Sequence, residues 1–81
     1  MKVLKFSATW CGPCKMLQAT IDSIHPPVDI QNVDIEEDFE VARQYNIRGV
    51  PTLVMLDDSG NEIKRVSGTK TKEQLLEWLN N

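Results

Sequence analysis

Cys11 and Cys14 are the residues of this chain best suited to chemistry, because they are its only cysteines and lie three positions apart. A structural disulfide gains most from closing a long loop, and a bond between these two would close a very short one. In a reducing compartment, a close pair of cysteines is typical of redox catalysis or of metal binding. Either chemistry depends on how the rest of the chain positions the two sulfur atoms.

Zinc binding would require about four ligands, and the two cysteines supply only half of them. His25 is the only other usual candidate, and the rise of a helix from Cys14 to His25 would separate them by about 16 Å. A zinc ion shared between the pairs of two chains remains an alternative, although nothing in the sequence supports it. We therefore expect no metal and a redox role for the pair.

The pair lies where a strand is predicted to meet a helix. Residues 2–7 indicate a short strand, and residues 8–12 a turn. A helix follows, because Leu17, Ile21 and Ile24 recur at helical spacing. The sequence His25-Pro26-Pro27 ends it.

This placement predicts different roles for the two cysteines. Cys11 lies near free backbone N–H groups and the positive end of the helix dipole, a contact worth up to about 2 kcal/mol. One pKa unit corresponds to about 1.4 kcal/mol, so the helix could lower the pKa of the Cys11 thiol from about 8.5 toward about 7. Cys14 lies one turn before Leu17 on the same apolar face of the predicted helix, so we expect it to be sheltered from solvent. We therefore expect Cys11 to be the exposed nucleophile and Cys14 to resolve the mixed disulfide. Pro13 fits the first turn because that position needs no N–H donor.

The middle of the chain predicts a second strand and a second helix. Residues 28–35 are rich in β-branched residues, but the alternation slips between Ile30 and Val33, so we expect a bulge or a shifted edge. The acidic residues within 36–40 suit the positive end of a helix running to about Asn46. Its predicted inner face consists of Phe39, Ala42 and Tyr45.

The last third of the chain predicts a hairpin and a final helix. Residues 52–56 form an apolar run typical of a strand covered on both faces. Residues 57–61 indicate a turn, and residues 62–67 a returning strand. Thr71 and Gln74 form a capping box that opens the last helix. The predicted inner residues of that helix are Leu75, Leu76 and Leu79.

The element order is therefore βαβαββα in a single domain covering residues 1–81. A right-handed crossover makes the first two strands parallel, and the hairpin makes the last two antiparallel. We predict an α/β fold with one four-stranded mixed sheet of order 2-1-3-4, flanked by three helices on its two faces.

Two segments and a glycine resemble the thioredoxin family. The segment Trp10-Cys11-Gly12-Pro13-Cys14-Lys15 resembles its redox motif, here between a predicted strand and a predicted helix. Residues 47–52 (IRGVPT) are similar to the segment that holds the family's cis-proline, and Gly68 matches a glycine before the last helix. The resemblance extends over essentially the whole chain from residue 2 and implies a thioredoxin-like fold.

The resemblance also implies a binding surface beside the cysteines. Pro51 should follow a cis peptide bond, and the backbone of Val50 should pair with an extended substrate segment. Lys15, next to Cys14, is predicted to modulate the pair. The flat apolar docking surface should comprise Trp10, Gly12, Pro13, Gly49 and Gly68.

The chain departs from the family pattern in two places. The family usually has a strand and a helix ahead of the active-site strand, whereas here we expect neither ahead of residue 2, so the second strand should be an exposed edge. This layout is more similar to glutaredoxins or to the short thioredoxins of some archaea and phages. Lys5 stands where the family often has a buried aspartate. We hypothesise that its ammonium lowers the pKa of Cys14; the alternative is that Lys5 extends past the sheet edge to solvent.

The implied function is a thiol–disulfide oxidoreductase that reduces protein disulfides in electron transport, with no bound cofactor beyond the redox-active Cys11–Cys14 disulfide. Its electron donor would be a thioredoxin-reductase-type enzyme, linked to NADPH or ferredoxin, or glutathione. One alternative is a glutaredoxin-like donor, for example to ribonucleotide reductase, although Lys15 and Arg48 are the only basic residues near enough to bind glutathione. Another is a non-catalytic binding subunit in which the cysteines are incidental.

Composition limits the partners and the location. The net charge of −3 argues against nucleic acid, and no apolar run approaches the roughly 20 residues needed to span a bilayer. The first residues lack the apolar core and cleavage site of a signal peptide. We therefore expect a cytoplasmic monomer.

Overall fold

The computed structural model describes residues 1–80 and contains four strands and three helices within that range. In chain order they are β1 (Lys2–Ser7), α1 (Gly12–Ile24), β2 (Asp29–Asp34), α2 (Phe39–Gln44), β3 (Thr52–Leu56), β4 (Glu62–Ser67) and α3 (Lys72–Asn80). The strands form one sheet of order β2-β1-β3-β4. β1 pairs in parallel with β2 and antiparallel with β3, which pairs antiparallel with β4. The predicted fold class and strand order are confirmed.

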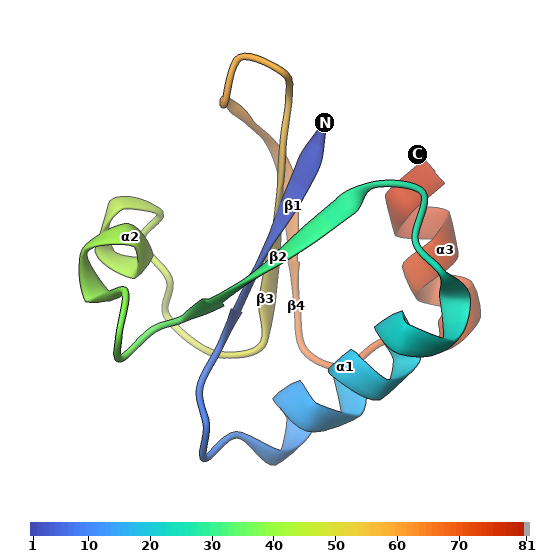
Figure 1. The fold of residues 1–81 in the computed structure, drawn as a ribbon, viewed down its shortest axis with the longest axis horizontal. Coiled ribbons are helices and arrows are strands. Elements are labelled where there is room, and N and C mark those ends of the chain that lie inside the picture. Colours follow the sequence, from blue (N-terminus) through green and yellow to red (C-terminus); the bar gives the residue numbers. More distant parts are fainter. Residues whose placement is uncertain (81) are drawn as a thin grey trace.

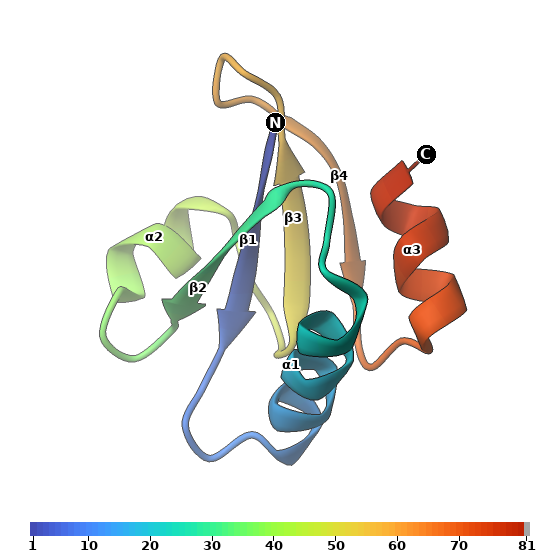
Figure 2. The ribbon, with the colours of Figure 1, turned by 45° about the vertical axis from the view of Figure 1, so that its right-hand side comes forward.

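The helices cover both faces of the sheet, as Figures 1 and 2 show: α1 and α3 lie on one face and α2 on the other. The inner side chains of β1 and β3 alternate between these two layers. The core under α1 and α3 contains Val3, Leu17, Ile21, Leu53, Met55, Leu75 and Leu79. The core under α2 contains Leu4, Phe6, Val33, Ala42, Val54 and Leu56. Both central strands are therefore buried on two sides, as predicted for residues 52–56.

The predicted bulge in the second strand is wrong. β2 pairs with β1 without interruption, from Lys2 opposite Asp29 to Ser7 opposite Asp34. The alternation slips because both faces of β2 are covered: Ile30 packs under α1 and α3, whereas Val33 belongs to the core under α2. A register irregularity occurs elsewhere, between β3 and β4.

The second helix is shorter than predicted. It begins at Phe39 and ends at Gln44, because residues 36 and 37 form a turn instead. In that turn the Asp34 carboxylate accepts hydrogen bonds from the backbone N–H groups of Glu36 and Glu37, at 2.8 and 3.3 Å. Phe39 is consequently not a core residue: it is 58% exposed. The inner face is formed by Val41, Ala42 and Tyr45.

The two longer helices follow the predicted signals. Leu17 and Ile21 of α1 are buried, and the helix ends at His25 in the left-handed conformation (φ 50°). At the start of α3 the Thr71 hydroxyl accepts from the Gln74 N–H, and the Gln74 side chain accepts from the Thr71 N–H, at 3.1 and 3.0 Å. This reciprocal pair is the predicted capping box.

Candidate active site

Cys11 and Cys14 lie at the start of α1, and Val50 of the loop from α2 to β3 packs against them. Figure 1 shows that the β1–α1 connection lies at the end of the sheet opposite the N-terminus. Cys11 is the N-cap of α1, with extended backbone angles (φ −89°, ψ 106°). Its Sγ accepts a hydrogen bond from the backbone N–H of Cys14, with an N···S distance of 3.1 Å. The two sulfurs form a disulfide, and the Cα atoms are 5.3 Å apart. The spacing therefore brings both sulfurs together on one turn of helix.

The predicted difference in exposure is absent from this disulfide-bonded form. Cys11 is 4% exposed and Cys14 is 2% exposed, so both are buried. Cys11 is covered because it packs in a small apolar cluster with Cys14 and Ala8, against which Ile35 and Val50 also lie. Residues far away in the sequence therefore help to cover the Cys11 sulfur. The helical spacing of apolar residues in α1 gives no information about them.

The loop from α2 to β3 supplies one wall of the site. The Val50–Pro51 peptide bond is cis, as the resemblance implied. Two hydrogen bonds hold the loop: the Thr52 hydroxyl donates to the Gly49 carbonyl at 2.8 Å, and the Gly68 N–H donates to the Pro51 carbonyl at 3.0 Å. Gly68 has a φ of 84°, which favours glycine at this position.

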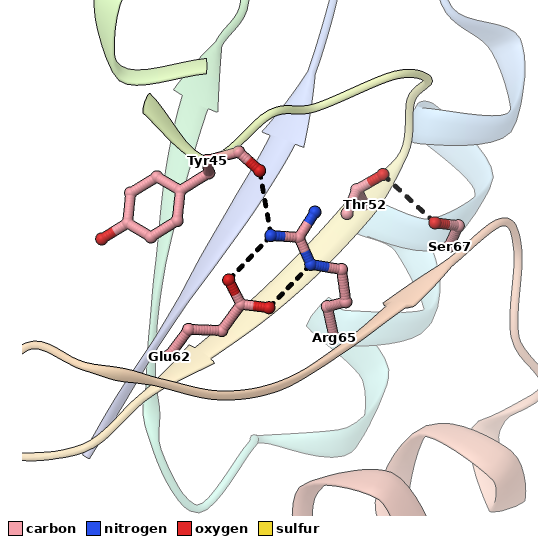
Figure 3. A network of polar contacts seen from close by, with 5 residues as sticks. All are labelled: Tyr45, Thr52, Glu62, Arg65 and Ser67. Atoms are coloured by element: carbon pink, nitrogen blue, oxygen red, sulfur yellow. Dashed lines mark hydrogen bonds and ion pairs between the residues drawn. The ribbon is translucent and has the colours of Figure 1, made fainter. Parts of the chain in front are cut away.

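Side chains of β4 brace the same loop from outside (Figure 3). The Arg65 guanidinium donates to both carboxylate oxygens of Glu62 at 2.7 Å and to the Tyr45 carbonyl at 2.9 Å. It thereby ties β4 to Tyr45, the residue that follows α2. The hydroxyls of Thr52 and Ser67 lie 3.4 Å apart and connect β3 to β4 beneath the loop.

A groove of about 430 Å³ adjoins the cysteine cluster through Ile35 and Val50, which line the groove and also pack against the cluster, although neither cysteine lines it. Trp10, which is 66% exposed, lines it together with Gly49 and Val50, three of the residues predicted to dock substrate. Gly12, Pro13 and Gly68 are exposed but do not line it. The remaining lining residues were not predicted to dock substrate, although Arg48 was considered as a glutathione contact: Ile35, Phe39, Ala42, Arg43, Asn46, Ile47 and Arg48. Two signals were present in the sequence: residues 47–52 resemble the family's cis-proline segment, and Phe39 carries an aromatic ring, which the helical spacing misassigned to the core.

Lys5 and Lys15 lie on another side of the pair. Both line a second cavity, of about 260 Å³, together with Cys14. Lys5 is only 4% exposed, so the alternative in which its side chain extends past the sheet edge to solvent is wrong. Lys15 is exposed on α1. Arg48 lines the groove and not this cavity, so the two basic residues considered for glutathione are not brought together.

Comparison with known proteins identifies the family. A sequence model described as Thioredoxin matches residues 1–81. The chain belongs to the thioredoxin family. Thioredoxin from Chlamydia pneumoniae is 38% identical over 81 residues, which span 96% of this chain and 78% of that protein. Thioredoxin from Staphylococcus aureus is 34% identical over 83 residues, which span 98% of this chain and 79% of that protein.

Solved thioredoxin structures agree with this membership. A mutant thioredoxin from Halobacterium salinarum superposes with a TM-score of 0.88 at 31% identity, covering 98% of this chain and 71% of that one. The oxidised form of mitochondrial thioredoxin 3 from Saccharomyces cerevisiae gives 0.82 at 31% identity, covering 98% and 76%. Membership and the CxxC disulfide make the protein a thiol–disulfide oxidoreductase of the disulfide reductase class.

Two further findings concern residues 1–80. None of the helices in that range is both long and apolar enough to cross a bilayer. Over the same range, no group of three or more His, Cys, Asp or Glu side chains is arranged to hold a metal ion.

Proposed function

We propose that the protein reduces disulfides of other proteins, with Cys11 as the attacking thiol and Cys14 as the resolving thiol. The Cys11 thiolate attacks one sulfur of the substrate disulfide; a Cys11–substrate bond forms, the substrate bond breaks, and the first substrate thiolate leaves and takes up a proton. The Cys14 thiolate then attacks Cys11 Sγ, which forms the Cys11–Cys14 disulfide and releases the second substrate thiolate. Two electrons pass from the protein to the substrate.

The observation that carries this assignment is the hydrogen bond from the Cys14 N–H to Cys11 Sγ at the N-cap of α1. In the dithiol form the same N–H points at the sulfur that must become negative, and the helix dipole adds to the effect. Cys14 lies inside the helix, where its own N–H is directed away from its sulfur. The local electrostatics therefore favour thiolate at Cys11 and make it the better nucleophile.

A substrate segment would bind across the loop from α2 to β3. Val50 packs against the cysteine cluster, so its backbone would be near enough to the pair to hydrogen-bond with an extended peptide. The neighbouring groove would take an apolar side chain of the substrate, because Trp10 and Ile47 are among its lining residues. The substrate disulfide would then lie over Cys11.

Electrons would come from a reductase of the thioredoxin-reductase type, linked to NADPH or ferredoxin. Glutathione is less well supported, because Lys15 and Arg48 line different cavities. We place this electron transport in the cytoplasm, since the proposed cycle needs a compartment that keeps the Cys11–Cys14 pair reduced.

Catalysed reduction of insulin by dithiothreitol tests the function. Catalytic amounts of the protein are expected to accelerate insulin precipitation well above the rate with dithiothreitol alone. The donor is tested by replacing dithiothreitol with NADPH and a thioredoxin reductase, or with glutathione, NADPH and glutathione reductase. The absence of any acceleration would overturn the proposed function and favour a binding subunit.

Substitution of Trp10 by alanine tests the docking surface. Removing this exposed ring is expected to raise KM for insulin by about five- to tenfold, because an aromatic contact at an interface is worth about 1 kcal/mol or more. The rate with a small linear disulfide such as hydroxyethyl disulfide should change less than twofold. Ile63→Ala is the matched control, since Ile63 is an exposed apolar residue of β4 that does not line the groove. Equal KM values for the two variants would rule out docking on Trp10.

A further inference from the structure

Lys5 is a buried cation that hydrogen-bonds to an amide and not to a carboxylate. Its side chain is almost fully covered, and neither of the ion pairs formed within residues 1–80 includes it. Its Nζ donates one hydrogen bond, to Asn32 Oδ1 at 3.3 Å, and that oxygen also accepts from the Ser7 hydroxyl at 2.8 Å. Because a buried charge is costly unless something compensates it, the surroundings of this ammonium should contain a reason for its position.

The register of the sheet places Lys5 beneath α1. Lys5 is opposite Asn32 on β2 and opposite Leu53 on β3, and Leu53 belongs to the core under α1 and α3. The side chain therefore lies on the face of the sheet that α1 covers, where it lines the same cavity as Cys14. The full lining of this cavity is Lys5, Ser7, Ala8, Thr9, Cys14, Lys15, Gln18, Asn32 and Asp34.

The charges around the cavity single out Cys14. Burial lowers the pKa of Lys5, and the Asp22 carboxylate on α1 partly offsets this effect. Asp34 also lines the cavity, but one of its carboxylate oxygens is already bonded to two backbone N–H groups. Lys15 adds a second positive charge at the exposed rim. Among the anions that can face this cavity, only the Cys14 thiolate appears and disappears with the redox reaction.

We propose that the Lys5 ammonium stabilises the Cys14 thiolate across this shared cavity, and so promotes the attack of Cys14 on Cys11 Sγ. Lys5 acts through Cys14 and is a positioning residue that does not contact the substrate. The proposal rests on the assignment of Cys14 as the resolving thiol. During that attack the negative charge leaves with the substrate thiolate, and Lys5 again faces a neutral disulfide.

The charge on Cys14 also affects the equilibrium between the dithiol and disulfide forms of the protein. Whenever Cys14 is ionised in the dithiol form, Lys5 faces a thiolate, whereas in the disulfide form its ammonium donates a hydrogen bond to Asn32 and faces no charged sulfur. Lys5 therefore stabilises the dithiol form relative to the disulfide form, which makes the protein a weaker reductant. Removal of the charge should make it a stronger reductant while slowing the resolving step.

The test measures thiolate formation by Cys14 in the Cys11→Ser background, through ultraviolet absorbance across a pH titration. Adding Lys5→Met is expected to raise the midpoint by about one pH unit, equivalent to about tenfold less thiolate on the acidic side. Lys15→Met is the matched control, because it removes an exposed positive charge from the same cavity. Solvent screening should limit its shift to less than about a third of a unit.

Two further measurements separate electrostatics from a structural role. With both cysteines intact, and at a pH above both titration midpoints, where Cys14 is ionised in the dithiol form, Lys5→Met should shift the equilibrium with glutathione about tenfold toward the disulfide, which is about 30 mV. Lys5→Gln, which can still hydrogen-bond to Asn32, should show the same shift, and circular dichroism should be unchanged for both. Equal titration midpoints with and without Lys5, or equal effects of Lys5→Met and Lys15→Met, would overturn the proposal. Both results stand whether or not the wild type reduces insulin, so the failure of the proposed function remains distinguishable.

Discussion

Replacement of Cys11 by serine is expected to abolish insulin reduction, by at least about a thousandfold, because the hydroxyl of serine cannot replace a thiolate as nucleophile. Replacement of Cys14 by serine should also stop turnover, but at a later step. Its Cys11 can still attack the substrate, and no neighbouring thiol releases the mixed disulfide. The two variants should therefore be equally inactive in turnover and differ in what accumulates.

Mass spectrometry after incubation with a disulfide-containing peptide measures that difference. Cys14→Ser is expected to carry a peptide adduct that dithiothreitol removes, whereas Cys11→Ser should carry much less. The double variant, with serine at both positions, is the control for non-covalent association. An adduct confined to Cys11→Ser would reverse the roles of the two cysteines. Full insulin reduction by either variant would exclude the dithiol mechanism.

Phe6→Ala is expected to lower the free energy of unfolding by about 3–5 kcal/mol. The Phe6 side chain is fully buried in the core under α2, and its ring contacts Tyr45 with centroids 5.7 Å apart. Alanine would remove the ring and leave a cavity between a central strand and α2. Because domains of this size have only about 4–12 kcal/mol of stability in total, the variant should be partly or largely unfolded at 37 °C.

Phe39→Ala is the matched control, since Phe6 and Phe39 are the only phenylalanines of the chain. Phe39 is exposed at the groove, so its loss should change the free energy of unfolding by no more than about 0.5 kcal/mol. Urea denaturation followed by circular dichroism measures both variants. Comparable destabilisation by the two substitutions would contradict the burial of Phe6 and the exposure of Phe39.

The sequence allowed most of the fold to be predicted because the central strands and the longer helices carry strong local signals. Leu17 and Ile21 repeat at helical spacing, and residues 52–56 form a continuous apolar run; both patterns reflect burial that the structure confirms. Thr71 and Gln74 cap α3 through contacts only three residues apart. Such signals need no knowledge of distant parts of the chain.

The errors occur where distant residues decide the outcome. The break in apolar alternation between Ile30 and Val33 resembles a bulge when β2 is considered alone. In the folded chain the two residues pack against cores on opposite faces of the sheet, and the strand pairing is uninterrupted. The start of α2 depends on the Asp34 carboxylate, which holds residues 36 and 37 in a turn. Helix propensity and the acidic residues within 36–40 predicted a start that is too early, and they therefore predicted a buried Phe39.

For the active site, the sequence by itself determined the redox pair and its position at the start of α1. Two cysteines with two residues between them, at the N-cap of a helix, are a property of one helical turn. Only the tertiary structure decided how the pair is covered and what faces it. Ile35 and Val50 pack against the cysteines, and β1 places the Lys5 ammonium beneath α1 beside Cys14. Burial and electrostatic surroundings arise from strands and loops that meet only in the folded chain, so no local pattern could encode them.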